Sequence, residues 1–367
     1  MILRRRATGV KGAPADSVVY GFAMRFAFAL ALCASLGSSG AVAAEGVKWA
    51  DGSLDGALAR ARAERKWVLV DVAASWCGPC HEMDEKVYSR AEVAAAFGEW
   101  VPLKRDGEVG DGAAIVERYH VVGYPTLLVL SADGEEVDRV MGFVEAKELL
   151  GRLADFRNGR GTLAELEKRA ATSHDPALAA ELAKRHALRG DGRAVAETEK
   201  VVAADLDGSA GRAPEALLVL GKYYWLRGRK DHAQAARTLE RLAQLFPSSK
   251  AARDEAPYNL AIAYHGLGDD ARALKTLDAW LDGGAERYNA YAWCCFKNGF
   301  GRARAIAVAR EGLAKHPDAD ALWDSLAELL AQDGHADEAV AAERKALAAK
   351  PNDRYYASQL ARFGGRR

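Results

Sequence analysis

The chain has 367 residues, which is long for one domain and suggests two. Its 51 basic and 51 acidic side chains cancel, so neither nucleic acid nor an anionic membrane surface is favoured as a partner. β-Branched residues become rarer after about residue 155, where alanine and leucine dominate. The composition therefore predicts a mixed α/β part followed by an all-helical part, and the motifs described next set their bounds at residues 46–157 and 158–367.

The first 44 residues have the features of an export signal. Met24-Arg25 supplies a positive charge ahead of the apolar run 26–36, and small residues then offer cleavage after Ala43 or Ala44. The run is too short to span a bilayer, although a retained membrane anchor is the alternative. We therefore predict a cleaved signal peptide and a periplasmic or secreted protein, with Met24 as a candidate start.

Apolar runs and helical patterns alternate through the α/β part. In chain order, helices are expected over residues 54–65, 78–90, 92–97, 111–119 and 145–157, and strands over residues 67–72, 100–104, 126–130 and 137–141. Asp133-Gly134, between the last two strands, is a hairpin turn signal. A βαβ unit followed by an antiparallel hairpin predicts a mixed sheet flanked by helices.

The most informative motif is Trp76-Cys77-Gly78-Pro79-Cys80, between the first strand and the helix that follows it. At such a junction Cys77 occupies a helix N-terminus, where unpaired N–H groups and the helix dipole stabilise a thiolate nucleophile. A zinc site would need two further ligands in a second cluster, and the sequence shows none. A purely structural disulfide is the other alternative. The position favours a redox-active pair.

Residues 46–157 resemble the thioredoxin fold at three separated places. The motif 76–80 matches the family's active site residue for residue, and Asp71 matches its buried aspartate on the preceding strand. Gly123-Tyr124-Pro125-Thr126 matches the family's cis-proline loop, and Gly142 lies where the family keeps a glycine near the active site. The resemblance implies an α/β thioredoxin fold and a protein-disulfide oxidoreductase.

The cysteines and the aspartate receive distinct roles. Cys77 is the expected attacking nucleophile, and Cys80 is the resolving cysteine that breaks the mixed disulfide. The resemblance makes Asp71 the proton acceptor for Cys80, with a pKa raised by burial; a solvent-exposed aspartate at a strand end is the alternative. The redox-active Cys77–Cys80 disulfide would serve without a cofactor or a metal.

The remaining motif residues are expected to shape the approach to Cys77. Gly78 and Pro79 carry no large side chain, and proline suits a first helical turn, while Trp76 packs beside the disulfide. The resemblance implies that a cis Pro125 leaves the backbone of Tyr124 free to pair with an extended substrate. The expected substrate-binding residues are Tyr124, Gly123 and Gly142.

The dipeptide between the cysteines bears on the direction of electron flow. Gly78-Pro79 favours a reductant or an isomerase over an oxidase, because the intervening residues tune the potential. An exported reductase needs electrons from a membrane donor. The segment 85–93 resembles the C-terminal domain of transmembrane thiol:disulfide interchange reductases, which agrees with that requirement.

Beyond Gly159 the sequence repeats in helical pairs. The clearest unit, Trp323 to Pro351, fits the tetratricopeptide pattern, in which two antiparallel helices meet at small residues. The preceding unit ends at Pro317, 34 positions before Pro351. About five such units are expected, clearest over 254–351, which is enough to bury a continuous core. The prediction is an all-α tetratricopeptide (TPR) solenoid.

Such an array commonly presents a concave groove to a peptide or a partner protein; a scaffold or a dimerisation arm is the alternative. The register offers Lys222, Trp225, Tyr258, Ile262 and His265 as groove candidates.

Two further cysteines, Cys294 and Cys295, lie in the third unit. The preferred register puts Ala292 at the helix crossing and Cys295 in the core, where it acts as a small hydrophobic residue. A redox relay through Cys294 would require that residue to be exposed.

Two function classes follow from these features. The first is an exported thiol:disulfide oxidoreductase that acts on disulfide-containing client proteins, whose repeat array recruits protein or peptide partners. The second is an assembly protein with a TPR scaffold in which the thioredoxin-like domain is mainly structural. The complete cysteine pair favours the first.

Overall fold

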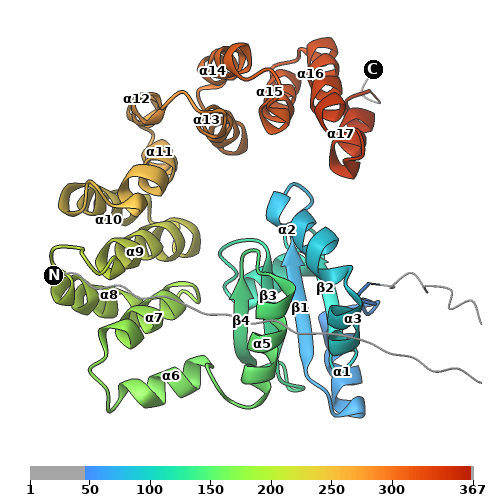
Figure 1. Cartoon of the computed structure of the whole chain (residues 1–367), viewed down its shortest axis with the longest axis vertical. Helices are drawn as coiled ribbons and strands as arrows, with labels where there is room; N and C mark the ends of the chain where they lie inside the picture. Colours follow the sequence, from blue (N-terminus) through green and yellow to red (C-terminus); the bar gives the residue numbers. More distant parts are fainter. Residues whose placement is uncertain (1–45, 365–367) are drawn as a thin grey trace, which may run out of the picture. The chain divides into compact units, whose positions relative to one another are not determined.

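The computed structural model describes residues 46–364 (Figure 1). The predicted signal peptide and its cleavage site lie outside the described residues. Within residues 46–364, the structure contains no helix with the length and apolar character needed to cross a membrane. An α/β domain precedes a helical region, which confirms the two expected fold classes.

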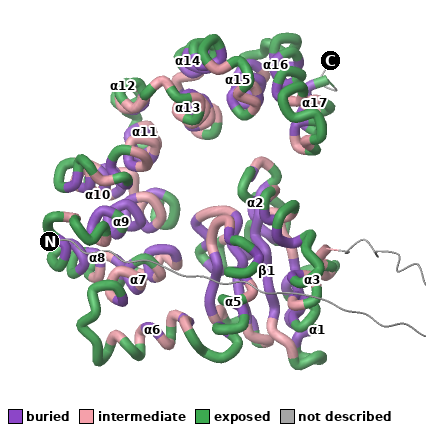
Figure 2. Tube along the Cα trace, viewed as in Figure 1, coloured by how far each residue is buried: buried purple, intermediate pink, exposed green. Residues whose placement is uncertain are grey.

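The N-terminal domain is built on a mixed sheet of four strands within residues 68–141, in the order β2-β1-β3-β4. Strand β1 (Val68–Ala73) pairs in parallel with β2 (Val101–Asp106) and antiparallel with β3 (Thr126–Leu130), which pairs antiparallel with β4 (Glu136–Met141). Strand β1 is buried along its whole length, as its run of apolar residues predicts (Figure 2).

Helices cover both faces of this sheet. Their bounds are α1 (Leu54–Glu64), α2 (Gly78–Met83), η1 (Asp84–Tyr88), α3 (Ala91–Phe97), α4 (Asp111–Arg118) and α5 (Ala146–Arg157). Leu69 packs with residues of α2, η1, α3 and α5, whereas Val68 and Val70 pack with residues of α1 and α4. Alternate residues of one strand therefore supply two separate cores.

The segment after the cysteine motif differs from the single helix expected over 78–90. Helix α2 ends at Met83 and continues as the π-helix η1. Apolar spacing over one or two turns does not separate the two helix types, so the sequence pattern missed the change. The wider turn ends at the buried Tyr88, which contacts the functional site.

Consecutive helices pack in pairs through the described part of the helical region, residues 163–364. A single helix, α6 (Leu163–Ala170), precedes the pairs. The pairs are α7 (Pro176–Ala187) with α8 (Arg193–Ala204); α9 (Arg212–Val219) and η2 (Leu220–Gly228) with α10 (His232–Leu245); η3 (Ala251–Glu255) and α11 (Ala256–Gly266) with α12 (Asp270–Trp280); α13 (Ala285–Asn298) with α14 (Arg302–Lys315); and α15 (Asp320–Gln332) with α16 (Ala336–Ala349). A last helix, α17 (Arg354–Gly364), packs on α16.

Small buried residues allow the paired helices to approach. Ala261, Ala292 and Ala327 are fully buried, and a Cβ added at Gly221 would lie 2.7 Å from Leu239 of the facing helix. The preferred register around Ala292 is therefore confirmed. Cys295 is buried as expected; Cys294 is buried too, and both thiols are free. The exposure that a redox relay through Cys294 requires is therefore not met.

The helical region joins the sheet through a buried ion-pair network on β4. The carboxylate of Asp138 is fully buried and accepts hydrogen bonds from Arg185 Nη1 at 2.6 Å and Arg189 Nη2 at 2.7 Å. Arg139 Nη1 donates to the carbonyl of Leu188 at 3.0 Å. These bonds connect the edge strand β4 to α7 and to the turn after it. The helical region therefore hinders pairing of this edge with a strand of another chain.

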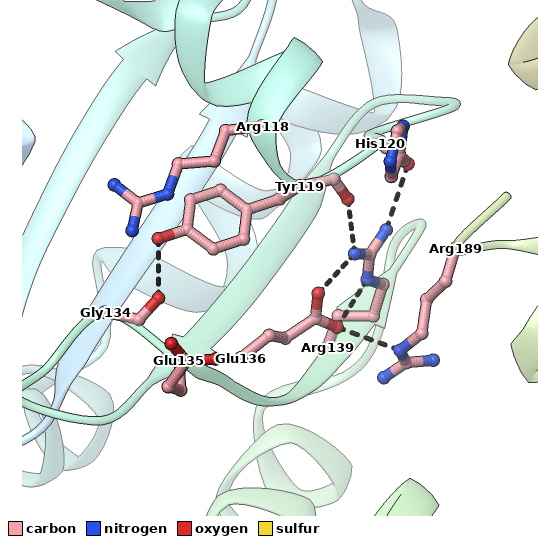
Figure 3. Close-up of a pocket in the computed structure, with 8 residues that line it drawn as sticks. All are labelled: Arg118, Tyr119, His120, Gly134, Glu135, Glu136, Arg139 and Arg189. Atoms are coloured by element: carbon pink, nitrogen blue, oxygen red, sulfur yellow. Dashed lines mark hydrogen bonds and ion pairs between the residues drawn. The ribbon is translucent and has the colours of Figure 1, made fainter. Parts of the chain in front are cut away.

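A cavity of about 290 Å³ lies beside this network. Figure 3 shows Arg139 and Arg189 converging on Glu136 there, with Arg139 also reaching the backbone carbonyls of Tyr119 and His120. Arg139 and Arg189 are thus engaged by a carboxylate and by carbonyls, and Arg118 lies over the Tyr119 ring, 5.1 Å from its centroid, which indicates a structural joint.

Replacing the buried carboxylate should weaken the fold. Asp138→Ala leaves Arg185 and Arg189 without their shared carboxylate, and removing one partner from a buried ion pair costs about 3 kcal/mol or more. Equilibrium urea denaturation should show that loss in the free energy of unfolding. In the control Glu199→Ala, which breaks an exposed pair with Arg241, the loss should stay below about 1 kcal/mol. Equal losses in the two variants would contradict a structural role for the joint.

A cluster of buried acids between α15 and α16 should make stability depend on pH. Burial, together with neighbouring carboxylates, raises the pKa of Asp324 to about 7 and the pKa of Glu343 to about 9. Because these values exceed the ordinary 3.8 and 4.5, the protonated cluster favours folding at low pH. That contribution is fully present only below the ordinary values, and it is lost as pH rises from them through the raised values.

The free energy of unfolding should therefore fall between about pH 4, where the unfolded carboxyls ionise, and about pH 9. Glu343→Gln, which cannot ionise, should flatten that slope and exceed the wild type by more than about 1 kcal/mol at the alkaline end. Urea denaturation across this range measures both. A slope unchanged in the variant would contradict the assignment.

Candidate functional site

The two cysteines of the motif lie where β1 gives way to α2. Cys77 is the N-cap of α2, and its Sγ accepts a hydrogen bond from the backbone N–H of Cys80 at 3.2 Å. The two residues form a disulfide. Only 3% of Cys77 is exposed, whereas Gly78 and Pro79 are exposed, and a Cβ placed on Gly78 would meet no atom within 4 Å. The open side of the disulfide is therefore over this dipeptide.

Tyr124, in the proline loop, packs against the same disulfide. The Tyr124–Pro125 peptide bond is cis, as the resemblance implied. The backbone N–H of Gly142 donates to the carbonyl of Pro125 at 2.8 Å, and Gly142 has a φ of +84°, a conformation that suits glycine. The Thr126 hydroxyl donates to the carbonyl of Gly123 at 2.7 Å. The structure thus brings all the predicted loop residues to one place.

Apolar and aromatic side chains surround the cysteines. Trp76 and Tyr124 pack against a small cluster that contains Cys77 and Cys80, and their rings lie 6.1 Å apart at 65°. Burial and the nearby carboxylates of Glu108 and Asp106 raise the pKa of Tyr124 to about 12. Tyr124 is therefore a neutral, packing group at physiological pH.

Asp71, on β1, is held in a buried polar cluster. It is 1% exposed, its Oδ2 lies 3.0 Å from Lys104 Nζ, and its Oδ1 accepts from the hydroxyl of Tyr88 at 3.2 Å. Burial raises the pKa of Asp71, although Lys104 opposes the shift, so the expected direction is confirmed. Lys104 also pairs with Asp84 at 2.5 Å.

Sequence reasoning missed Lys104 and Tyr88 as neighbours of the aspartate. Lys104 is the register partner of Asp71 on β2. The signal for it was a lysine at the end of an otherwise apolar strand. The π-helix brings Tyr88 within reach from the other side.

Residues of the helical region also contact this site. Lys297 Nζ lies 3.8 Å from the centroid of the Trp76 ring, and the ring of Trp293 lies 6.2 Å away. The ring of Tyr355, on α17, lies 5.4 Å from that of His81. None of these residues was predicted for the site, because their spacing within the repeats carries no sign of what they face.

The five predicted groove residues lie half-buried in the array. Lys222 forms an ion pair with Glu255 at 2.8 Å, and His265 stacks on Phe300 with ring centroids 4.6 Å apart. Trp225, Tyr258 and Ile262 pack against the array core. Their role as a client-binding groove stays a prediction.

Comparison with known proteins identifies the N-terminal domain. Residues 48–132 match the family model described as thioredoxin-like. The thiol:disulfide interchange protein DsbD of Pseudomonas fluorescens is 36% identical over 111 residues, which cover 29% of this chain and 19% of that protein. The match therefore spans less than a fifth of that relative's length. The domain is thioredoxin-like and carries the cysteine pair of a thiol-disulfide oxidoreductase.

Solved structures match each part of the chain separately. The solution structure of a disulphide-isomerase candidate from Bacteroides thetaiotaomicron is 37% identical and covers 32% of this chain and 98% of its own, with a TM-score of 0.30. The crystal structure of the MamA protein is 23% identical and covers 48% of this chain and 92% of its own, with a TM-score of 0.35.

The position of Asp71 predicts how exchange depends on pH. If its carboxylate takes the proton of Cys80, the rate of disulfide exchange should rise with pH through the raised pKa of Asp71. Asp71→Asn should lose this rising limb of the pH–rate profile and slow resolution of the mixed disulfide about 100-fold. Rapid-quench alkylation of the mixed disulfide across pH measures both.

Asp84→Asn is the matched control. It removes the half-exposed carboxylate that also pairs with Lys104, and it leaves Asp71 in place. It should keep the limb and lose less than about tenfold in rate. A limb retained in Asp71→Asn would exclude Asp71 as the proton acceptor.

Proposed function

We propose that this protein is an exported thiol:disulfide oxidoreductase that reduces or isomerises protein disulfides through Cys77 and Cys80, and whose helical repeats recruit protein partners. The observation that carries the proposal is the site itself. The Cys77–Cys80 disulfide packs with Ala73, at the end of β1, and with Tyr124, whose bond to Pro125 is cis, and the buried Asp71 lies on the same strand.

The two cysteines alone supply the electrons for the exchange reaction. The reduced Cys77 thiolate attacks a client disulfide, forms a mixed disulfide and releases one client thiolate. Cys80, after losing its proton, then attacks Cys77 Sγ, which releases the second client thiolate and leaves the Cys77–Cys80 disulfide. Two electrons pass from the protein to the client, and Asp71 accepts the proton of Cys80.

The geometry supports roles for the neighbouring residues. The small, exposed Gly78 and Pro79 leave Cys77 open to attack from one side. The loop at Tyr124 and Pro125 offers backbone to an extended client segment. Trp76 and Tyr124 keep water from much of the disulfide by packing around it.

We infer the direction of electron flow and the compartment from sequence features. Gly78-Pro79 favours reduction or isomerisation, and the apolar run near the N-terminus favours export. An exported reductase must be re-reduced, and a membrane-bound dithiol donor is the proposed source. The likeness to an interchange protein supports this assignment at the level of the reaction class.

Reduction of insulin disulfides in the presence of a dithiol reductant tests the proposal. The wild type should accelerate the reaction at least about tenfold over the reductant alone, and Cys77→Ser should abolish the acceleration because the attacking thiolate is lost. Cys294→Ala is the matched control, since it also removes one cysteine, and it should retain the activity. The scaffold alternative predicts no acceleration by the wild type, and that result would overturn the proposal.

A further inference from the structure

Three elements of the helical region, α13, α17 and η2, contact residues around the Cys77–Cys80 disulfide, which we call the exchange site. Helix α13 contacts Trp76 through Trp293 and Lys297. Helix α17 contacts His81 through Tyr355. The surroundings of Cys77 are therefore shared between the two parts of the chain, and the array supplies side chains to the site.

The π-helix η2 reaches the proline loop in the same way. A Cβ placed on Gly123 would lie 3.4 Å from Arg227 Nη1 and 3.8 Å from a ring carbon of Tyr223. The guanidinium of Arg227 lies over the Tyr223 ring, 5.1 Å from its centroid. A cation on an aromatic ring thus faces the loop that is expected to bind the client backbone.

The same pairing of a cation with an aromatic ring occurs on the other side of the cysteine motif. Lys297 lies over Trp76, as Arg227 lies over Tyr223. We call Tyr223, Arg227, Trp293 and Lys297 the cationic rim. Both of its cations are exposed. The rim thus places two positive charges beside Cys77 and the proline loop.

Neither rim cation is neutralised by an ion pair within residues 46–364. Other basic residues of the array are paired: Lys222 with Glu255, and Arg287 with Asp254. Two carboxylates lie near Tyr124. Asp106 accepts a hydrogen bond from the backbone N–H of Glu108 at 2.9 Å, and Glu108 accepts one from Trp76 Nε1 at 2.8 Å, on the edge of the ring rather than on its face. The rim cations are left available to an outside anion.

We propose that the clients are extended protein segments in which acidic side chains flank the disulfide-bonded cysteine. Arg227 and Lys297 bind those carboxylates while Cys77 attacks the disulfide. This inference rests on the proposed exchange reaction and names its substrate class. An extended segment fits because Cys77 is nearly buried, and contacts from the array surround its neighbours on several sides.

Single-turnover kinetics with three disulfides test the inference on the full chain. The protein is reduced, freed of reductant and mixed with 2-hydroxyethyl disulfide or with one of two cystine-linked peptides. The peptides differ only in having Asp and Glu, or Asn and Gln, beside the cysteine. Alkylation after quenching measures the second-order rate constant for oxidation of Cys77 and Cys80.

The wild type should react with the acidic peptide about five- to tenfold faster than with the peptide that carries Asn and Gln. This ratio of rate constants should decrease in high salt. In Arg227→Gln/Lys297→Gln the ratio should approach one. The control Lys275→Gln/Arg344→Gln changes the net charge equally at exposed positions elsewhere in the array and should keep the wild-type ratio.

The outcomes separate the two proposals. If the neutral disulfide does not oxidise the wild-type cysteines, the exchange function itself fails. If it does but the two peptides react alike, or the preference survives in the rim variant, the inference is overturned. Should the rim variant fail to fold by circular dichroism, the peptide ratio and its salt dependence on the wild type decide the question.

Discussion

Asp138 lies on the last strand of the sheet with its carboxylate fully buried, and donors from the helical region satisfy it. Arg185 and Arg189 reach it from α7 and the turn beyond, and the backbone N–H of Leu163 reaches it at 2.8 Å from the start of α6. A buried carboxylate without such partners would be strongly unfavourable. The sheet edge and the first helices of the array must therefore form together, and the contacts of the later helices with the exchange site depend on that joint.

Two buried aspartates in this domain, Asp138 and Asp71, differ in how completely their carboxylates are paired. Asp138 meets two arginines and a backbone N–H, so its charge is well matched by donors. Asp71 meets one lysine, which a second carboxylate shares, and one tyrosine hydroxyl, and burial raises its pKa. Asp138 therefore has a structural role, whereas the raised pKa of Asp71 agrees with the role proposed for it as acceptor of the Cys80 proton.

Sequence patterns located the parts of the site that are local and missed those that depend on packing. Strand β1, the motif ending at Cys80 and the loop at Pro125 follow from short runs of residues, and the structure places each as expected. The pairing of Asp71 with Lys104 needs the register of two strands, and the contact of Trp293 with Trp76 needs the curvature of many stacked helices. Periodicity specifies which side chains face a core, but it carries no information about which exposed side chains meet another domain.

The cationic rim changes what the repeats contribute to exchange. Thiolate attack is intrinsically unselective among accessible disulfides, so selectivity must come from what surrounds the thiol. Each exposed ion pair contributes at most about 1 kcal/mol, which is too little to hold a client but enough to rank clients by rate. Because the cations stand beside Cys77 and the proline loop, that small preference acts on the segment being attacked. An array that only captured clients at a distance would raise the local concentration of every disulfide in them, whereas side chains at the site discriminate between one disulfide and another.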